Sequence, residues 1–449
     1  MKLGKLKAEF ISKDKRFNSS YFLNGDAFNS RVIEINKDKC LPLGEMAKVF
    51  NPPIFKRQFC QKTERAVPYC QSSDVTNALE GSEVYINKQQ AIKVGSVVKK
   101  NQILITGFGT IGNTRLVNEL SEGISYANNV CRVECNDDVK FGYIYAFLSS
   151  KYGVSQINKN ASGSVVRYIE SPGIKKTLVP ILDIEKQKEI HDLILKTSLL
   201  RVEANKLLQE SIAYFNNYNI NYSYGNINSQ KIGIKKVASG FKRFDSLYNI
   251  VSQKVDDCIH NSDLTFVTIK SQTEKIFIGP RSKRNYVEEG VPFLSTSAMQ
   301  KANPTKTTKY ISQALSKDFR VGEGWLLTCR SGTLGDSIYV LQIFSNYAIS
   351  EDAIRIVVKE NSRISKEYIY AFLKSKIGCN SLLSGSYGSV IQHLNEEYIG
   401  EIKIPILQVQ YVNKIGELIK QHLENINSAI ILENQAIDLI EKEIESWQE

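Results

Sequence analysis

The chain repeats itself with a spacing of about 225 residues, and this feature restricts its fold more than any other. Residues 15–21 read KRFNSSY and residues 242–248 read KRFDSLY, which agree at five of seven positions. Solenoid repeats are only about 20–50 residues long, so a repeat of this length indicates a duplicated domain. Four further pairs keep nearly the same spacing: VPYCQSSDV (67–75) with VPFLSTSAM (291–299), GTIGN (109–113) with GTLGD (332–336), GYIYAFLSSKYG (142–153) with EYIYAFLKSKIG (367–378), and VPIL (179–182) with IPIL (404–407).

Each copy ends in a segment with the periodicity of a long helix. After Pro180 and after Pro405, mostly apolar residues recur at three- and four-residue spacing, and Glu433 is the one polar interruption of the second set. A helix of about 30 residues is roughly 45 Å long, which is too long for the interior of a small domain. We therefore expect the two helices to pair; packing of each on its own domain is the alternative. The residues expected to pair are Ile190, Leu193, Leu200, Leu207, Ile415, Ile419, Ile426, Ile430, Ile437, Ile440 and Ile444.

The rest of each copy has the pattern of short strands mixed with helices. Runs such as NQILITG and AIRIVV are separated by Gly, Asn and Ser, and YIYAFL has a helix-like composition. The stretch NNYNINYSYGNINSQ (216–230) is nearly uncharged and typical of a linker. The sequence predicts an α+β fold of two duplicated globules, each followed by a long helix. The predicted segments are globule 1–182, helix 183–215, linker 216–235, globule 236–406 and helix 407–449.

Composition excludes several classes of protein. With 449 residues, 42% of them hydrophobic, the chain can form more than one core. It has no run of about 18 uncharged apolar residues, and its start lacks the apolar core of a signal peptide, so we expect a cytoplasmic protein without a membrane span. The eight cysteines form no CxxC pair and the four histidines are isolated, so we expect neither a zinc site nor a disulfide framework.

Charge is distributed unevenly along the chain. The net charge is +11, yet residues 408–449 contain eight acidic residues and only three lysines. A basic body with an acidic helical tail indicates that the body binds a polyanion and the tail does not. An ordinary lysine-rich surface is the alternative.

Two strings resemble enzyme motifs. GFGTIG (107–112) has the GxGxxG pattern of dinucleotide-binding turns, but the duplicate reads RSGTLG and neither copy has a clear βαβ unit. We interpret the shared Gly-Thr-[Ile/Leu]-Gly as a tight structural turn. NPPIF (51–55) is close to the element that amino-methylating DNA methyltransferases place against a flipped base, but Ile54 stands where an aromatic residue is needed. We interpret it as a proline turn, and we find no catalytic residues in either copy.

A basic loop recurs at one place in both copies. IFKRQF contributes Lys56 and Arg57, and GPRSKRNY contributes Arg281, Lys283 and Arg284, with Phe or Tyr interleaved. Lys and Arg in such loops neutralise phosphates, and Arg can also bind guanine in the major groove. We predict that these five residues contact DNA; solvated surface charge is the alternative for each.

Taken together, these features resemble one known family. Two diverged globules, the GTIG and GTLG turns, a GSV segment in each copy, and VPILDIEKQKEI and IPILQVQYVNKI at the helix starts are similar to the specificity (S) subunits of Type I restriction-modification systems. The resemblance covers essentially the whole chain. The Glu-Gln pair that commonly follows the proline in that family is altered here, because Lys186 separates Glu185 from Gln187 and the second copy has only Gln408 and Gln410.

The resemblance implies a specific function. Each globule would be a target recognition domain that reads one half of a bipartite, asymmetric sequence in double-stranded DNA. The helices would pair antiparallel as a spacer, and a length of about 45 Å suits half-sites one turn, or about 34–36 Å, apart. The chain would be non-catalytic and bind no cofactor. Its partners would be two methyltransferase subunits, which methylate adenine at N6 with S-adenosylmethionine, and ATP-dependent restriction motor subunits.

Two other functions are compatible with the sequence. A coiled-coil adaptor with two protein-binding globules would show weak, salt-insensitive affinity for DNA. A self-contained DNA methyltransferase would depend on Asn51 of the NPPIF string, whereas a specificity subunit would not.

Overall fold

The computed structural model describes residues 12, 19–23, 25–78, 84–163, 166–217, 248–249, 263–332, 334–388 and 392–447. The chain divides into two compact units, which are described one at a time. The first unit comprises residues 1–202 and 428–449, and the second unit comprises residues 203–427. The predicted linker, residues 216–235, lies outside the described residues except for its first two, which still belong to a helix. Most of the KRF repeat also lies outside them.

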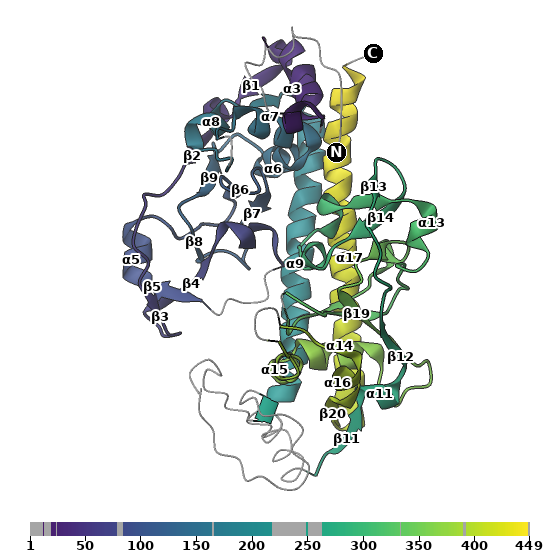
Figure 1. Ribbon diagram of the computed structural model, residues 1–449. Coiled ribbons are helices and arrows are strands. Elements are labelled where there is room, and N and C mark those ends of the chain that lie inside the picture. The colour runs from purple at the N-terminus through teal and green to yellow at the C-terminus, as the bar shows by residue number, and fades with distance from the viewer. Residues whose placement is uncertain are drawn as a thin grey trace. The chain divides into compact units, whose positions relative to one another are not determined.

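Short strands form the framework of the first unit (Figure 1). β1 (Cys40–Pro42) pairs antiparallel with β10 (Leu178–Pro180). One four-stranded sheet has the order β2–β9–β6–β7, with strands at Ala47–Phe50, Val130–Cys135, Ile103–Thr106 and Thr114–Leu116. The other has the order β3–β5–β4–β8, with strands at Phe59–Cys60, Tyr85–Asn87, Ala66–Cys70 and Ser125–Tyr126.

The second unit repeats this topology strand for strand. β11 (Thr265–Thr268) pairs antiparallel with β20 (Lys403–Ile406). One sheet has the order β12–β19–β16–β17, with strands at Thr273–Ile278, Ala353–Val358, Leu326–Cys329 and Ser337–Tyr339. The other has the order β13–β15–β14–β18, with strands at Tyr286–Val287, Lys309–Ile311, Val291–Leu294 and Ala348–Ile349. The duplication and the α+β fold class are confirmed.

Short helices connect the strands. In the first unit they are α2 (Ser19–Leu23), α3 (Asp26–Ile35), η1 (Lys37–Lys39), α4 (Leu43–Met46), η2 (Ser72–Thr76), α5 (Lys88–Lys93), α6 (Phe141–Ser149), α7 (Lys151–Asn160) and α8 (Ser171–Lys175). In the second unit they are α11 (Ile269–Gln272), α12 (Thr296–Met299), η4 (Pro304–Thr307), α13 (Gln313–Ser316), η5 (Gln342–Phe344), α14 (Lys366–Lys374), α15 (Lys376–Ser384) and α16 (Glu396–Glu401).

Equivalent hydrogen bonds give the repeated YIYAFL phrase the same structural role in both copies. Tyr143, in the YIYAFL phrase of α6, donates its hydroxyl proton to the carbonyl of Pro180 at 2.7 Å. Its duplicate Tyr368, in α14, donates in the same way to the carbonyl of Pro405 at 2.8 Å. Both hydroxyls are buried. One bond joins α6 to β10, and the other joins α14 to β20. These phrases are therefore scaffold, because buried hydroxyls need a partner.

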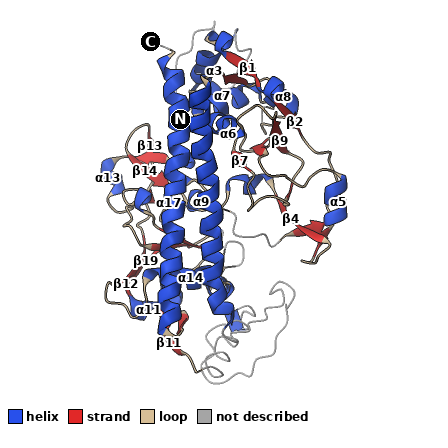
Figure 2. Ribbon diagram, turned by 180° about the vertical axis from the view of Figure 1, so that it is seen from behind, coloured by secondary structure: helices blue, strands red, loops and turns tan. Residues whose placement is uncertain are grey.

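Two long helices complete the fold. α9 (Ile184–Asn217) follows the first domain and α17 (Val409–Ser446) follows the second. Each unit contains a stretch of both helices, which lie side by side (Figures 1 and 2). The core of the first unit includes Ile190 and Ile194 of α9 together with Ile437, Ile440 and Ile444 of α17.

Contacts within each unit show that the helices are antiparallel. In the first unit, Lys186 pairs with Glu443 at 2.6 Å, and Thr197 lies 3.4 Å from the carbonyl oxygen of Ala429. In the second unit, His422 is bonded to the carbonyl of Ala204, and the rings of Tyr214 and Tyr411 lie 5.4 Å apart. In both units, contacts further along α9 involve residues earlier in α17, so the two helices run in opposite directions. The predicted pairing of the long helices is confirmed.

The residues predicted for this pairing lie mostly inside. Ile190, Leu207, Ile415, Ile419, Ile430, Ile437, Ile440 and Ile444 are buried, and Leu193, Leu200 and Ile426 are half-buried. α9 also buries Ile194, Leu208 and Phe215, which the predicted stripe did not include. The rings of Phe215 and Tyr368 lie 5.3 Å apart, so α9 is covered by α14 of the second unit as well as by α17.

Candidate nucleic-acid interface

The five predicted DNA-contacting residues lie in loops at equivalent places. Lys56 and Arg57 lie between β2 and β3, whereas Arg281, Lys283 and Arg284 lie between β12 and β13. All are exposed except the half-buried Arg284. Phe50 pairs with Arg132 and Phe277 pairs with Arg355 in the sheets, so the two loops begin at the same register. Arg57 and Arg284 each follow seven residues later and are therefore equivalent.

Each of these two arginines lies over the buried ring of an equivalent pair of aromatic residues. The guanidinium carbon of Arg57 is 5.7 Å from the centre of the Tyr69 ring, and Phe59 packs edge-on against Tyr69. The guanidinium carbon of Arg284 is also 5.7 Å from its ring, Phe293, against which Tyr286 packs. Phe59 is 62% exposed and Tyr286 is 45% exposed. Each loop thus combines an arginine, which can bind a phosphate, with a nearby exposed aromatic ring, which can stack on a base.

The second arginine has acidic partners that sequence reasoning missed. Arg284 donates to the Glu351 carboxylate at 2.7 Å and to the Ser350 hydroxyl at 3.1 Å. The hydrogen bond with Glu351 is the main reason that the pKa of Arg284 is raised. Glu351 lies 67 residues from Arg284 in the sequence, so no local pattern signals the pair.

The GxGxxG string forms a β-hairpin. Gly109 and Gly112 have φ of 75° and 84°, and their duplicates Gly332 and Gly335 have φ of 87° and 88°. Such values favour glycine, which explains why the turn is repeated. The turn joins the antiparallel strands β6 and β7, whereas a dinucleotide-binding turn joins a strand to a helix. The geometry agrees with the structural interpretation of this string.

The NPPIF string is also structural. The Asn51 side-chain amide donates to the carbonyl of Asn128 at 3.0 Å and accepts from the Ser171 backbone N–H at 3.0 Å. Both ends of the amide are thus bonded to backbone, while Ile54 is 87% exposed. The arrangement joins the loop after β2 to the loop before β9 and to the first residue of α8, and no aromatic ring stands at position 54 to stack on a flipped base.

A pair of buried arginines was also missed. Arg132 of β9 and Arg355 of β19 are 1% and 0% exposed and occupy equivalent positions. Arg132 donates to the carbonyls of Ser96 at 3.0 Å and Tyr126 at 2.9 Å, and Arg355 donates to the carbonyl of Ile349 at 2.8 Å. Burial lowers the pKa of both to about 10, so they stay charged at neutral pH. Each holds one sheet to the last strand of the other. A sequence signal for this pair exists, because arginine is the third residue of both strands, VCRVEC and AIRIVV.

The helix pair contains a buried polar cluster in the first unit. Glu433 of α17 is 1% exposed and accepts hydrogen bonds from the Tyr145 hydroxyl and from Arg201, whose Nη2 lies 2.7 Å from its Oε2. This cluster accounts for the one polar interruption in the second helical stripe. In a different register the two charges would be separated, and burying either charge without its partner is costly.

In the second unit, acid should weaken the helix pair through His422. This ring donates from Nδ1 to the carbonyl of Ala204 at 2.8 Å, and burial lowers its pKa to about 4. An unfolded histidine has a pKa of about 6.5, so below that pH the unfolded chain binds a proton that the folded chain does not. This contribution to stability is complete above pH 6.5 and is lost as pH falls towards 4. At pH 5 the loss is about 2 kcal/mol.

Urea denaturation at pH 7 and pH 5 measures this loss. The variant His422→Gln is the control, because its amide can still donate to the Ala204 carbonyl but does not titrate. The wild type should lose more stability than the variant between the two pH values. Equal losses would mean that His422 does not carry the effect.

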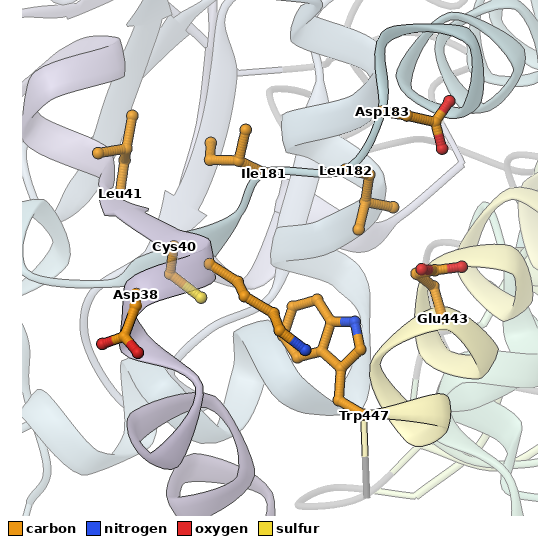
Figure 3. A pocket seen from close by; sticks show the side chains of 9 residues that line it. Asp38, Cys40, Leu41, Ile181, Leu182, Asp183, Glu443 and Trp447 are labelled. Carbon is orange, nitrogen blue, oxygen red and sulfur yellow. The ribbon is translucent and has the colours of Figure 1, made fainter. Parts of the chain in front are cut away.

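A pocket of about 710 Å³ opens in the first unit (Figure 3). Glu443 of α17 and Trp447, the residue after this helix, face residues of β1 and of the segment before α9. The Lys39 ammonium lies 4.9 Å from the centre of the Trp447 ring. Burial raises the pKa of Cys40 to about 11, so this thiol is not a ready nucleophile. The lining residues are Asp38, Lys39, Cys40, Leu41, Ile181, Leu182, Asp183, Glu443 and Trp447.

The described residues include no group of three or more His, Cys, Asp or Glu side chains placed to hold a metal ion. None of the helices in this part of the chain combines the length and the apolar composition that a membrane crossing requires.

The fold and the basic loops define a protein with two copies of one α+β domain, each presenting cations beside aromatic rings, and a pair of long helices. Comparison with known proteins identifies the family. The family model described as Type I restriction modification DNA specificity domain matches twice, at residues 39–213 and 261–442. The chain belongs to this family and carries two copies of its domain.

Solved structures of similar proteins are distant in sequence. A Type-I restriction-modification system S subunit from M. genitalium is 14% identical, with 89% of this chain and 95% of that chain covered and a TM-score of 0.36. The HsdS subunit from Thermoanaerobacter tengcongensis is 13% identical, with 90% and 95% covered and a TM-score of 0.28. No curated protein matches the chain at a significant level.

Proposed function

We propose that this chain is the DNA-reading subunit of a Type I restriction-modification complex, in which each α+β domain recognises one half of a bipartite target. The observation that carries the proposal is the family match to both copies, each with a basic, aromatic-lined loop at the same register. The two copies share strand order but differ in loop residues. The two half-sites therefore differ, and the target is asymmetric.

The chain itself performs no chemistry under this proposal. Its partners in the cytoplasm are two methyltransferase subunits, which use S-adenosylmethionine to methylate adenine at N6, and ATP-dependent restriction motor subunits. Two observations support this division of labour. The GxGxxG string is a hairpin turn, and the Asn51 amide is occupied by backbone groups. The paired helices act as the spacer between the two reading domains.

Mapping N6-methyladenine in the host genome by long-read sequencing, with and without this gene, tests the proposal. We expect one split motif with a fixed gap to lose its methylation completely when the gene is deleted, because the methyltransferase then has no reader. Restoring the gene should restore the same motif.

Two results would contradict the proposed function. An unchanged methylome, in cells where the partner methyltransferase is present and active, would favour a protein-binding adaptor. Methyl transfer from S-adenosylmethionine to DNA by the purified chain alone would make it an enzyme.

A further inference from the structure

Of four equivalent positions around the basic loop, one holds arginine in both copies and the other three differ in charge. Their equivalence follows from the strands. Gly107 follows the last residue of β6 and Arg330 follows the last residue of β16. Residues 128–129 directly precede β9, and residues 351–352 directly precede β19. The first copy has Arg57, Gly107, Asn128 and Asn129, and the second has Arg284, Arg330, Glu351 and Asp352.

In the second copy these four residues form a neutral cluster. Besides its bond to Glu351, Arg284 has its Nη2 3.6 Å from Oδ2 of Asp352. The other oxygen of Asp352 lies 3.9 Å from Nη1 of Arg330. The backbone N–H of Arg330 also donates to the Asp352 carbonyl at 2.7 Å. Two cations and two anions thus offset one another.

In the first copy the arginine is left with its charge uncompensated. Arg57 donates to the neutral Tyr69 hydroxyl at 2.9 Å, and among the residues that the structure describes no carboxylate lies within ion-pair distance of it. Amides at 128 and 129 replace the two acids. A side chain cannot replace Gly107, because its Cβ would lie 2.5 Å from the Ile169 carbonyl oxygen.

The aromatic partners differ in a matching way. Tyr69 and Phe293 are equivalent, since each pairs with the first residue of the neighbouring parallel strand, at Ser125 and Ala348. Only Tyr69 has a hydroxyl that can accept from its arginine. Each copy therefore holds its arginine with a different group, and only the second neutralises it.

We propose that the two equivalent arginines have different roles: Arg57 contacts a DNA phosphate, whereas Arg284 positions the second loop through Glu351 and Asp352. The inference rests on the proposed function. To reach a phosphate, Arg284 must leave two carboxylates, whereas Arg57 leaves only a phenol. The basic loop of the second copy contacts the DNA phosphates through Arg281 and Lys283, which are exposed.

Binding of the full chain to a fluorescent 40-base-pair duplex of mixed sequence, measured over a series of salt concentrations, tests the assignment. Each phosphate contact contributes about one to the slope of log affinity against log salt. Arg57→Gln should lower the slope by about one and weaken binding about 3- to 10-fold at moderate salt. Arg284→Gln, the matched change, should leave the slope unchanged.

Exchanging the acidic positions provides the sharper test. Giving the second copy the residues of the first, with Glu351→Asn and Asp352→Asn together, should free Arg284 and raise the slope by about one or more. The reverse change, Asn128→Glu in the first copy, should lower the slope by about one. Melting curves identify any variant that fails to fold. If one of the two exchanges fails to fold, the salt dependence of the other exchange tests the proposal.

Two outcomes separate failure of this inference from failure of the proposed function. If the wild type binds with a steep salt dependence but Arg57→Gln and Arg284→Gln lower the slope equally, the division of roles is wrong. If the wild type itself binds without salt dependence, the proposed DNA-reading function fails with it.

Discussion

Glu433→Ala should lower the free energy of unfolding of the first unit by about 3–5 kcal/mol, because it removes the carboxylate that compensates a guanidinium held between two helices. Glu433 accepts from Arg201 and from the Tyr145 hydroxyl, so both donors lose this carboxylate at once. The side chain of Arg201 is only 18% exposed, and water cannot fully replace the carboxylate. Chemical denaturation followed by circular dichroism measures the change.

Two further variants make this result interpretable. Asp438→Ala removes an exposed acid from the same helix and should change stability by less than about 0.5 kcal/mol. Removing both charges, with Arg201→Met and Glu433→Leu, should recover most of the loss, because a buried ion pair contributes little beyond apolar packing. Leu208, buried at the equivalent position of α9, shows that leucine suits such a site. A cost below 1 kcal/mol for Glu433→Ala would refute the account.

Arg132→Met should destabilise the first unit by about 3 kcal/mol. The guanidinium donates to four backbone carbonyls, those of Ser96, Tyr126, Ala127 and Val130. Losing the donor for a buried carbonyl costs about 1–3 kcal/mol, and relief from burying a charge offsets part of the total. Methionine keeps much of the volume, so the change isolates the hydrogen bonds.

The control for this variant is Arg65→Met, which removes the same charge from an exposed position and should change stability by less than about 0.5 kcal/mol. Hydrogen exchange localises the effect: amides of β8 and β9 should exchange faster in Arg132→Met and not in Arg65→Met. If the two variants melt alike, the carbonyl contacts do not hold the sheets together.

The sequence was sufficient to predict the duplicated α+β fold and the paired helices, because both depend on patterns that repeat. It was insufficient wherever a contact joins distant residues. The role of Arg284 depends on Glu351, and that of Arg132 depends on carbonyls up to 36 residues away. In both copies the buried arginine stands within a mostly apolar strand, so the strand pattern does not single it out. Phe215 was missed because a single stripe was assumed, whereas α9 packs on more than one side.

The division of the chain into units has a consequence for synthesis on the ribosome. Ile190 and Ile194 share the first unit's core with Ala436, Ile437, Ile440 and Ile444. Between these groups the ribosome must make the whole second unit, residues 203–427. Translation proceeds at about 5–20 residues per second, so the apolar surface of α9 stays unpaired for more than about ten seconds before α17 is made. The domain that is translated first is therefore the one that finishes folding last, and the nascent chain is vulnerable to aggregation throughout that interval.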